Sequence, residues 1–252
     1  MFKQFFENKK AVFFDLDGTI VDSNAMWEQA MVNVLKLSEN DWVDFSELPA
    51  GMYLEEKWDY IVSMLNLDVK NSIKELVELT NREYFNLAAK AGIKVKDGFW
   101  SFHYEIKQNL KLKTALISNA DKAIVTEVLR IIGMENLFDF IIGGDEVKKH
   151  KPAPDVYIAG LKNLNLKPQE VLVFEDSLPG VESARNAGLD VIVIWDGKHY
   201  KEEYKGPILT FAPDFSQFVG ALDKTRSEYL KGVYFMRTDI KPEEAPLINQ
   251  KQ

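Results

Sequence analysis

The chain has 252 residues, of which 46% are hydrophobic and 28% charged, and its formal net charge is −8. These values are typical of one large globular domain, or of a core domain with a smaller insertion, and they argue against extended disorder. The acidic balance excludes nucleic acid and anionic membranes as expected partners, and the lack of cysteine excludes disulfides, thiolate metal sites and cysteine nucleophiles.

The N-terminal segment lacks the uninterrupted apolar core that a signal peptide needs. Charged residues interrupt the apolar ones among the first ten residues, and the apolar run at 11–14 is far too short to cross a bilayer. We therefore expect a cytoplasmic protein. No pattern in the sequence indicates an oligomeric state.

The first predicted element is a buried strand over residues 11–14, an apolar run without alternation between polar and apolar positions. Asp15 and Asp17 follow it directly. Because residues two apart along an extended chain point the same way, both carboxylates are predicted to face one region at the strand end. Gly18 then allows a sharp backbone turn.

Residues 24–91 predict an inserted helical unit. Three apolar stripes at helical spacing run through this stretch, which shows no good strand pattern. A loop at 48–51 separates the first two helices, and the chain returns through 92–98. The stripes contain Trp27, Met31, Val34 and Leu35; Leu54, Trp58, Ile61 and Leu65; and Ile73, Leu76, Val77, Tyr84 and Leu87.

After the insertion, strands predicted at 114–117, 140–142, 171–174 and 191–194 alternate with helices at 121–132 and 179–187, which Gly133 and Gly188 end. This alternation indicates a doubly wound α/β fold with a Rossmann-like parallel sheet. We expect residues 1–23 and 92–221 to form the core and 24–91 to form a helical cap. Residues 222–252 are a C-terminal extension of unassigned role, in which 233–236 is either a strand or part of a helix.

Polar clusters follow three of the predicted strands. Ser118 and Asn119 follow the strand at 114–117, and Glu175 and Asp176 follow the one at 171–174. Ligands of open α/β sheets bind at the carboxyl ends of the strands, so these clusters are expected to converge with the pair at 15 and 17. Lys151 stands before the proline-containing segment 152–154. Each cluster alone is compatible with an ordinary loop or helix-cap role, and together those readings require four coincidences.

Four motifs in this order resemble those of the haloacid dehalogenase-like hydrolase superfamily. The resemblance covers residues 11–194, and the stretches 143–155 and 173–188 are similar to the branch that contains β-phosphoglucomutase and sugar-phosphate phosphatases. That branch carries a helical cap between the first two motifs. The motifs are Asp15-Leu16-Asp17-Gly18-Thr19, Ser118-Asn119, Lys151-Pro152 and Glu175-Asp176-Ser177.

The resemblance implies a magnesium-dependent phosphoryl transfer. Asp15 would attack phosphorus to form an aspartyl-phosphate, while Asp17 would protonate the leaving group and then activate water. Mg²⁺, a hard cation that prefers oxygen, would be held by the Asp15 carboxylate, the Asp17 backbone carbonyl and Asp176, with Glu175 acting through a metal-bound water. The remaining side chains would bind phosphoryl oxygens: Ser118, Asn119 and Lys151.

The resemblance to this superfamily also narrows the set of reactions that we expect. Asp17 argues against dehalogenases and phosphonate-cleaving relatives, which lack this second acid. The mutase carries a threonine hinge and, four residues later, a cap histidine, whereas Ser23 and Trp27 stand at those positions here. We therefore expect a phosphatase of a small phosphorylated metabolite, with a phosphomutase and a catalytically silent binding module as the alternatives.

Two residues of the insertion are candidate substrate contacts, Trp27 and Lys57. Their patterns favour packing within the cap for Trp27 and a solvated position for Lys57. The three histidines show no metal-ligand spacing. His103 is predicted on a surface helix, His199 in a polar loop and His150 beside Lys151, all in structural or solvated roles.

Overall fold

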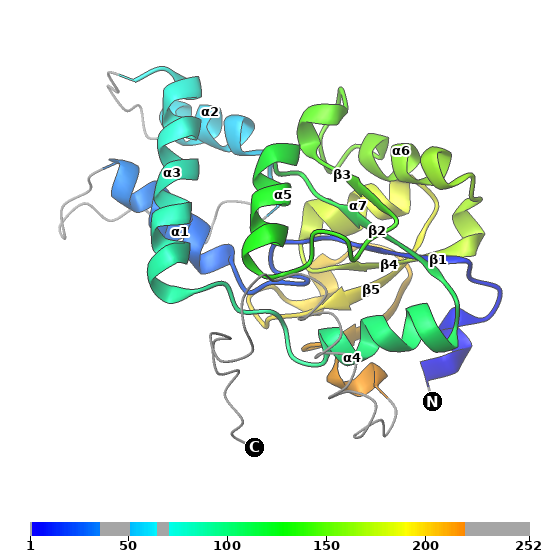
Figure 1. Ribbon diagram of the computed structural model, residues 1–252. Helices are drawn as coiled ribbons and strands as arrows, with labels where there is room; N and C mark the ends of the chain where they lie inside the picture. The colour runs from blue at the N-terminus through cyan, green and yellow to red at the C-terminus, as the bar shows by residue number, and fades with distance from the viewer. Residues whose placement is uncertain (1, 36–50, 65–70, 220–252) are drawn as a thin grey trace, which may run out of the picture.

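The computed structural model describes residues 2–35, 51–64 and 71–219, and a parallel six-stranded sheet forms its centre (Figure 1). The strand order is β3-β2-β1-β4-β5-β6, and every neighbouring pair is parallel. The predicted fold class is therefore confirmed. The strands are β1 (Ala11–Phe14), β2 (Lys113–Ile117), β3 (Phe140–Ile142), β4 (Val171–Glu175), β5 (Asp190–Ile194) and β6 (Ile208–Ala212).

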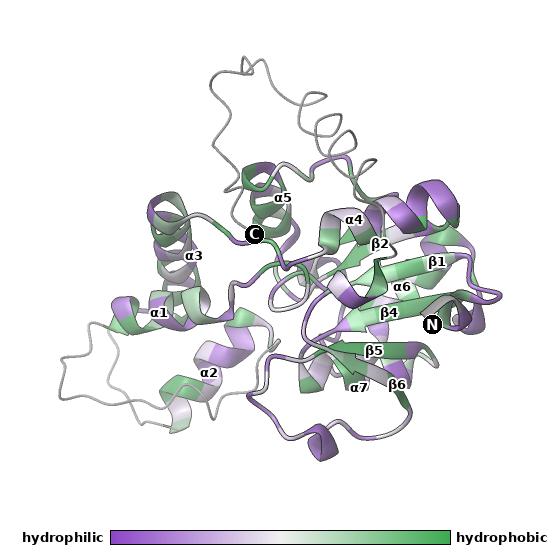
Figure 2. Ribbon diagram, turned by 90° about the horizontal axis from the view of Figure 1, so that it is seen from below, coloured by the Kyte–Doolittle hydropathy of each residue, from purple (hydrophilic) through white to green (hydrophobic). Residues whose placement is uncertain are grey.

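Helices cover both faces of this sheet. On one side lie α4 (Phe99–Tyr104) and α5 (Lys122–Ile131), and on the other α6 (Asp155–Leu164) and α7 (Leu178–Asn186) (Figure 1). Along β1, Val12 and Phe14 pack into the first layer while Ala11 and Phe13 pack into the second. Because both faces are buried, the strand sequence is apolar throughout, as the mainly hydrophobic colouring of the strands in Figure 2 shows.

The sequence locates five strands within one residue at each end and misses the sixth. Strand β6 pairs with β5 at the edge of the sheet, and four of its five residues are partly buried or exposed. The other edge strand, β3, is also partly buried and is located, so the edge position alone does not account for the miss. The π-helix Glu105–Asn109 also has no prediction of its own, whereas α4 lies where a helix carrying His103 is predicted without bounds.

Three helices occupy the described part of residues 24–91: α1 (Asn24–Leu35), α2 (Leu54–Met64) and α3 (Ile73–Ala91). Met31, Trp58, Ile61 and Leu76 form their shared apolar cluster, in which the Trp58 indole donates a hydrogen bond of 3.0 Å to Thr80. Most of the predicted loop at 48–51, the end of the second stripe at Leu65 and the extension 222–252 lie outside the described residues.

The two connections between these helices and the sheet lie side by side. Val21 bridges Val95, the Asp22 amide donates to the Lys94 carbonyl over 2.8 Å, and the Lys96 amide donates to the Ile20 carbonyl over 2.8 Å. The departing and returning chains are thus hydrogen-bonded to each other. This pairing fixes where α1 begins relative to the end of β1.

The prediction that His103 lies on a surface helix is wrong. Its side chain is 1% exposed, and its ring centre lies 5.8 Å from both Phe99 and Phe138. Helix α4 is apolar on most of its circumference because it fills the space between the sheet and the segment around Phe215. No helix in the described ranges is long and apolar enough to span a membrane.

Candidate active site

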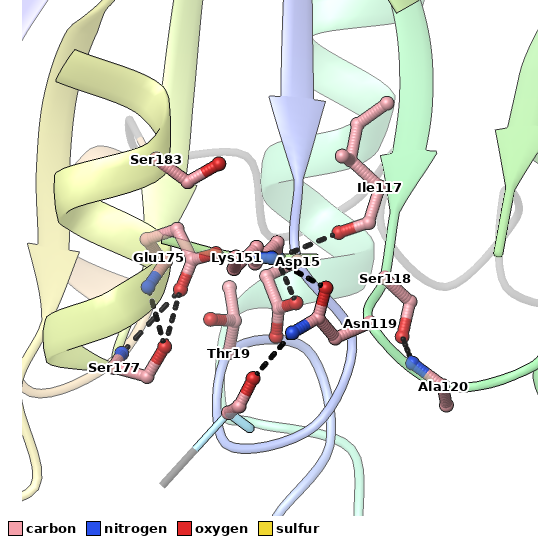
Figure 3. Close-up of polar contacts among 12 residues, drawn as sticks. Asp15, Thr19, Ile117, Ser118, Asn119, Ala120, Lys151, Glu175, Ser177 and Ser183 are labelled. Carbon is pink, nitrogen blue, oxygen red and sulfur yellow. Dashed lines mark hydrogen bonds and ion pairs between the residues drawn. The ribbon is translucent and has the colours of Figure 1, made fainter. Parts of the chain in front are cut away.

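The predicted polar clusters do converge at the carboxyl ends of three adjacent strands (Figure 3). Asp15 follows β1, Ser118 follows β2, and Glu175 ends β4 with Asp176 next to it. Strands β1 and β4 are neighbours in the sheet although far apart in sequence, so this is the point where the winding direction reverses. A crevice forms there because the connections leave it in opposite directions.

Lys151 ties this cluster together. Its ammonium group lies 2.7 Å from Asp15 Oδ1, 2.6 Å from Glu175 Oε1 and 3.0 Å from the Ile117 carbonyl, and the residue is 2% exposed (Figure 3). A buried ammonium between two carboxylates compensates part of their charge and restricts where they lie. Lys151 thereby fixes Asp15 at the end of β1.

Glu175 is held from several directions. Besides Lys151, its carboxylate accepts hydrogen bonds from the Tyr157 hydroxyl at 2.9 Å, the Asp176 amide at 3.1 Å and the Ser177 hydroxyl at 3.3 Å. Both carboxylate oxygens are therefore engaged within the protein. Glu175 therefore contacts Lys151 directly, a contact that is separate from its expected role through a metal-bound water.

Asp176 receives two side-chain hydrogen bonds, from Thr19 at 2.9 Å and from Asn24 at 3.1 Å. Gly18 lies against the same carboxylate, so that a side chain at position 18 would collide with it, and its φ of 82° is unfavourable for other residues. The turn after β1 thus needs glycine for two independent reasons. It brings Asp176 close to the first motif.

Asp17 contacts the helical insertion directly. Its Oδ1 atom accepts hydrogen bonds from Ser23 Oγ at 2.5 Å and Trp27 Nε1 at 2.9 Å. The Trp27 ring in turn stacks on Tyr84 of α3, with ring centres 3.9 Å apart and planes 11° from parallel. Trp27 therefore packs within the helices, as its stripe indicates, and also touches the site.

The carboxylates around Asp15 suit a divalent cation. Ligand oxygens of Asp15, Glu175 and Asp176 all lie within 4.8 Å of one another. Burial raises the pKa of Asp15 and of Asp17, and burial together with the Glu175 charge raises the pKa of Asp176 to about 7. Among the described residues, Lys151 is the cation that contacts this cluster. Hard oxygen donors and incompletely compensated negative charge together suit a divalent cation.

Ser118 and Asn119 make different contacts from one another. The Ser118 hydroxyl accepts from the Ala120 amide at 3.0 Å and borders the cleft above the site. Asn119 accepts from the Lys151 amide at 3.0 Å and donates from Nδ2 to the Gly51 carbonyl at 2.7 Å. The amide predicted to bind phosphate is thus engaged with the chain entering α2, and it links that segment to the loop of Lys151.

A cleft of about 350 Å³ opens above these residues. Asp15, Asp17 and Ser118 lie at its base, and residues of α1, α2 and α3 line the opposite side. Lys57 borders the cleft and is half-buried, so the prediction of a solvated lysine is wrong in this respect. Burial lowers the pKa of its ammonium group, with the charge of Glu28 acting in the opposite direction.

A second contact between the helices and the sheet layer lies at Tyr53. Its ring stacks on His150 at 3.7 Å and 12°, and its hydroxyl donates to Asp121 over 2.7 Å. His150 also lies 2.7 Å from Glu56. His150 therefore takes a structural role, as expected, at the place where the segment before α2 meets the core.

Comparison with known proteins agrees with the geometry of this site. The model of the haloacid dehalogenase-like hydrolase family matches residues 12–194. The chain belongs to this family. It is 30% identical to a phosphorylated carbohydrates phosphatase of Thermotoga maritima over 186 residues, which is 73% of this chain and 83% of the relative. It is also 30% identical over 193 residues to protein CbbY of Rhodobacter capsulatus, 73% of this chain and 84% of that protein.

Solved structures share the fold. CbbY of Rhodobacter sphaeroides in complex with phosphate superposes with a TM-score of 0.71 and 23% identity, covering 84% of this chain and 97% of that one. β-Phosphoglucomutase of Clostridium difficile gives a TM-score of 0.71 and 23% identity over 91% and 100%. As a haloacid dehalogenase-like hydrolase with relatives named as phosphatases, the chain is an enzyme of the phosphatase kind, as the sequence predicts.

Sequence reasoning gave no role to several residues of this haloacid dehalogenase-like site. Thr19 is within the first motif, where a hydroxyl after the turn is a usable signal. Asn24 begins α1, and its position next to the hinge gives only a weak one. Tyr157 and Tyr204 have no signal of this kind in the sequence around them. The Tyr157 hydroxyl donates to Glu175, and the Tyr204 hydroxyl donates to the Asp176 carbonyl at 2.7 Å.

Proposed function

We propose that this chain is a magnesium-dependent phosphatase that hydrolyses a small phosphorylated metabolite through an aspartyl-phosphate on Asp15. The observation that carries the proposal is the position of Asp15 at the base of the cleft, 2.7 Å from the Lys151 ammonium and in one cluster with Asp176. The name of the Thermotoga maritima relative supports phosphorylated carbohydrates or similar small esters as the substrates.

The first half-reaction forms a bond between Asp15 and phosphorus. Lys151 engages Oδ1 of Asp15, which leaves Oδ2 for the attack. The bond from phosphorus to the ester oxygen breaks, and Asp17 transfers its proton to that oxygen as the alcohol leaves. When bound by Asp15, Asp176 and the Asp17 carbonyl, Mg²⁺ supplies positive charge that offsets the repulsion between carboxylate and phosphate.

The second half-reaction restores the enzyme. Asp17, now a carboxylate, accepts a proton from water as the water oxygen attacks phosphorus. The bond between Asp15 and phosphorus breaks, which releases inorganic phosphate and the free carboxylate. Raised pKa values suit this exchange, because a carboxyl group in water would rarely hold the proton that Asp17 must donate.

Residues 24–91 act in this proposal as a cap on the core formed by 1–23 and 92–221. The helices line the cleft opposite Asp15, and Trp27 and Lys57 are the candidate contacts to the substrate there. A roofed cleft excludes bulk water and favours small metabolites over phosphoproteins. The formal net charge of −8 speaks against nucleic acid or anionic membranes as partners, and a place in the cytoplasm stays a prediction from the sequence.

The proposal is tested by turnover and by trapping of the intermediate. The purified protein should hydrolyse p-nitrophenyl phosphate with Mg²⁺ and lose that activity in EDTA. Acid-quenched protein should carry one added phosphate by intact mass, removable by hydroxylamine, which cleaves acyl phosphates. Transfer of the phosphate to a second position of a sugar phosphate would favour a phosphomutase instead, and absence of any turnover would favour a silent binding module.

A further inference from the structure

The lining of the cleft outside its base, called the distal part below, carries more negative than positive side chains. Among the described residues that line it, four carboxylates stand against two ammonium groups. A second phosphate on the substrate would have to lie among these carboxylates. The acidic residues are Glu28, Glu55, Glu78 and Asp121, and the basic ones are Lys57 and Lys74.

Both lysines already have an acidic neighbour. Lys57 experiences the charge of Glu28, whose carboxylate also lies 3.5 Å from Lys198 of the core, and the charge of Lys198 acts on Lys57 in the opposite direction. Lys74 and Glu78 are four residues apart on α3 and so lie on the same face of that helix. Within the described lining, carboxylates outnumber ammonium groups, so the lining as a whole offers no net positive charge to a second anionic group.

Apolar side chains make up much of the remaining distal lining. Methionines adapt to flat or irregular ligands and contact rings favourably, and an indole offers a broad apolar surface. The Trp27 ring is held in one plane by its stack on Tyr84. The apolar residues of this lining are Trp27, Met31, Met52, Leu54, Val77 and Ile124.

We infer that the substrate is a monophosphate ester whose leaving group is uncharged and has an apolar face, such as a ring-bearing alcohol, and that esters with a second phosphate are rejected. This inference rests on the proposed phosphatase activity and specifies its substrate class. The cleft of about 350 Å³ is within the size range of small-molecule sites. An uncharged ring loses apolar exposed surface there without bringing a new charge toward the carboxylates.

Three esters with the same reacting group test the inference. Ribose 5-phosphate, adenosine 5′-monophosphate and ribose 1,5-bisphosphate differ at one carbon, which carries a hydroxyl, a flat uncharged ring or a second phosphate. We expect kcat/KM to be about tenfold or more higher for the nucleotide than for ribose 5-phosphate, and about tenfold or more lower for the bisphosphate. Calorimetric binding of the three esters to the Asp15→Asn protein should give the same order without turnover.

A matched pair of variants tests the electrostatic part. Glu55 and Asp59 are exposed acids one turn apart on α2, and of these only Glu55 lines the cleft. Glu55→Lys should raise the kcat/KM of the bisphosphate relative to ribose 5-phosphate by about tenfold, whereas Asp59→Lys should leave this ratio within about twofold.

The outcomes separate the inference from the proposed function. If the protein hydrolyses these esters but prefers the bisphosphate, or shows no preference for the nucleotide, the inference is overturned while the phosphatase stands. If both lysine variants change the ratio equally, the distal carboxylates are not its cause and the electrostatic argument fails. If neither these esters nor p-nitrophenyl phosphate is hydrolysed with Mg²⁺, the proposed function fails and the inference fails with it.

Discussion

The base of the cleft and its distal part are built by different rules. At the base, Lys151 and Glu175 are buried, and each makes several hydrogen bonds, including some to groups from other elements of the core. In the distal part, Glu55 and Lys74 are exposed. Val77 lines the cleft, and its side chain also packs against the apolar cluster of the helices. The base therefore tolerates little change in geometry, whereas the distal part can be altered one residue at a time. Under the proposed function the reaction depends on the first region, and under the inferred substrate class the choice of substrate depends on the second.

Removal of the nucleophile should have the largest effect. Asp15→Asn keeps the shape of the side chain but loses the attacking oxyanion and one metal charge, so kcat should fall by about a thousandfold or more, about 4 kcal/mol of barrier. Turnover of p-nitrophenyl phosphate with Mg²⁺ is the measurement. The exposed Asp22, seven residues further on, provides the control variant Asp22→Asn, which should retain activity. Turnover by Asp15→Asn near the unsubstituted rate would remove Asp15 from the mechanism.

Loss of a metal ligand should come next. Asp176→Ala should weaken Mg²⁺ binding by about a hundredfold or more. Loss of a residue that only hydrogen-bonds to a metal ligand costs up to about a hundredfold, and loss of a ligand should cost at least as much. Because burial and the Glu175 charge raise the pKa of Asp176, its ionised form opposes folding in the absence of metal, and the variant should not lose thermal stability.

Calorimetric titration and melting with and without Mg²⁺ measure both effects. The metal-induced rise in Tm should disappear in Asp176→Ala and persist in Asp196→Ala, an exposed carboxylate in the loop after β5. Unchanged Mg²⁺ affinity in the first variant would move the metal site away from Asp176.

Trp27 joins the two regions, and its replacement should distinguish them. Trp27→Phe keeps a ring against Tyr84 but removes the N–H that lies 2.9 Å from Asp17. If this bond orients the acid, kcat for an alkyl phosphate should fall about tenfold, as is typical for misplaced proton donors, while kcat for p-nitrophenyl phosphate changes little because nitrophenolate leaves without a proton. Equal losses on both esters would mean that Trp27 only supports the packing of the helices.

The smallest effect concerns a buried group outside the cleft. Burial lowers the pKa of His103 to about 3, below its ordinary value of 6.5, so the folded state holds it neutral. The unfolded chain gains a proton as the pH falls below 6.5, and this contribution to stability, present above that pH, is progressively lost. The free energy of unfolding should drop by about 1 kcal/mol more for the unsubstituted protein than for His103→Phe between pH 7.5 and 5.5.

Urea unfolding at the two pH values gives this difference directly, and the comparison is between pH dependences, so it is insensitive to any change in packing. The activity of His103→Phe at pH 7.5 should match that of the unsubstituted protein. An identical pH dependence in both proteins would mean that the fold does not lower the pKa of His103.

The sequence predicts some parts of this fold and not others. Strands β1 and β4 are uninterrupted apolar runs because both of their faces are covered, and the acids at their ends stand where parallel strands finish, so both were predictable. The edge strand β6 and the buried His103 were not. Their character depends on what packs against them from distant parts of the chain, such as Phe138 beside His103.

Within the site, the motifs predicted which acids converge but not which partners they select. The bond from Trp27 to Asp17 depends on the angle at which α1 leaves the core, and that angle is set by the pairing between residues 20–22 and 94–96. The contact of Tyr157 with Glu175 joins a helix on one face of the sheet to a strand end. Neither relationship leaves a periodic trace in the sequence, because each rests on three-dimensional placement alone.

The pairing of Val21 with Val95 has a consequence for how such a protein can diversify. A segment whose two ends meet at one point can be lengthened, shortened or exchanged for another without shifting any strand of the sheet. Recombination at this junction would join the same core and its reacting groups to a different inserted segment. Joining Asp22 to Lys94 by a short turn should accordingly yield a smaller protein that still folds and still forms the sheet.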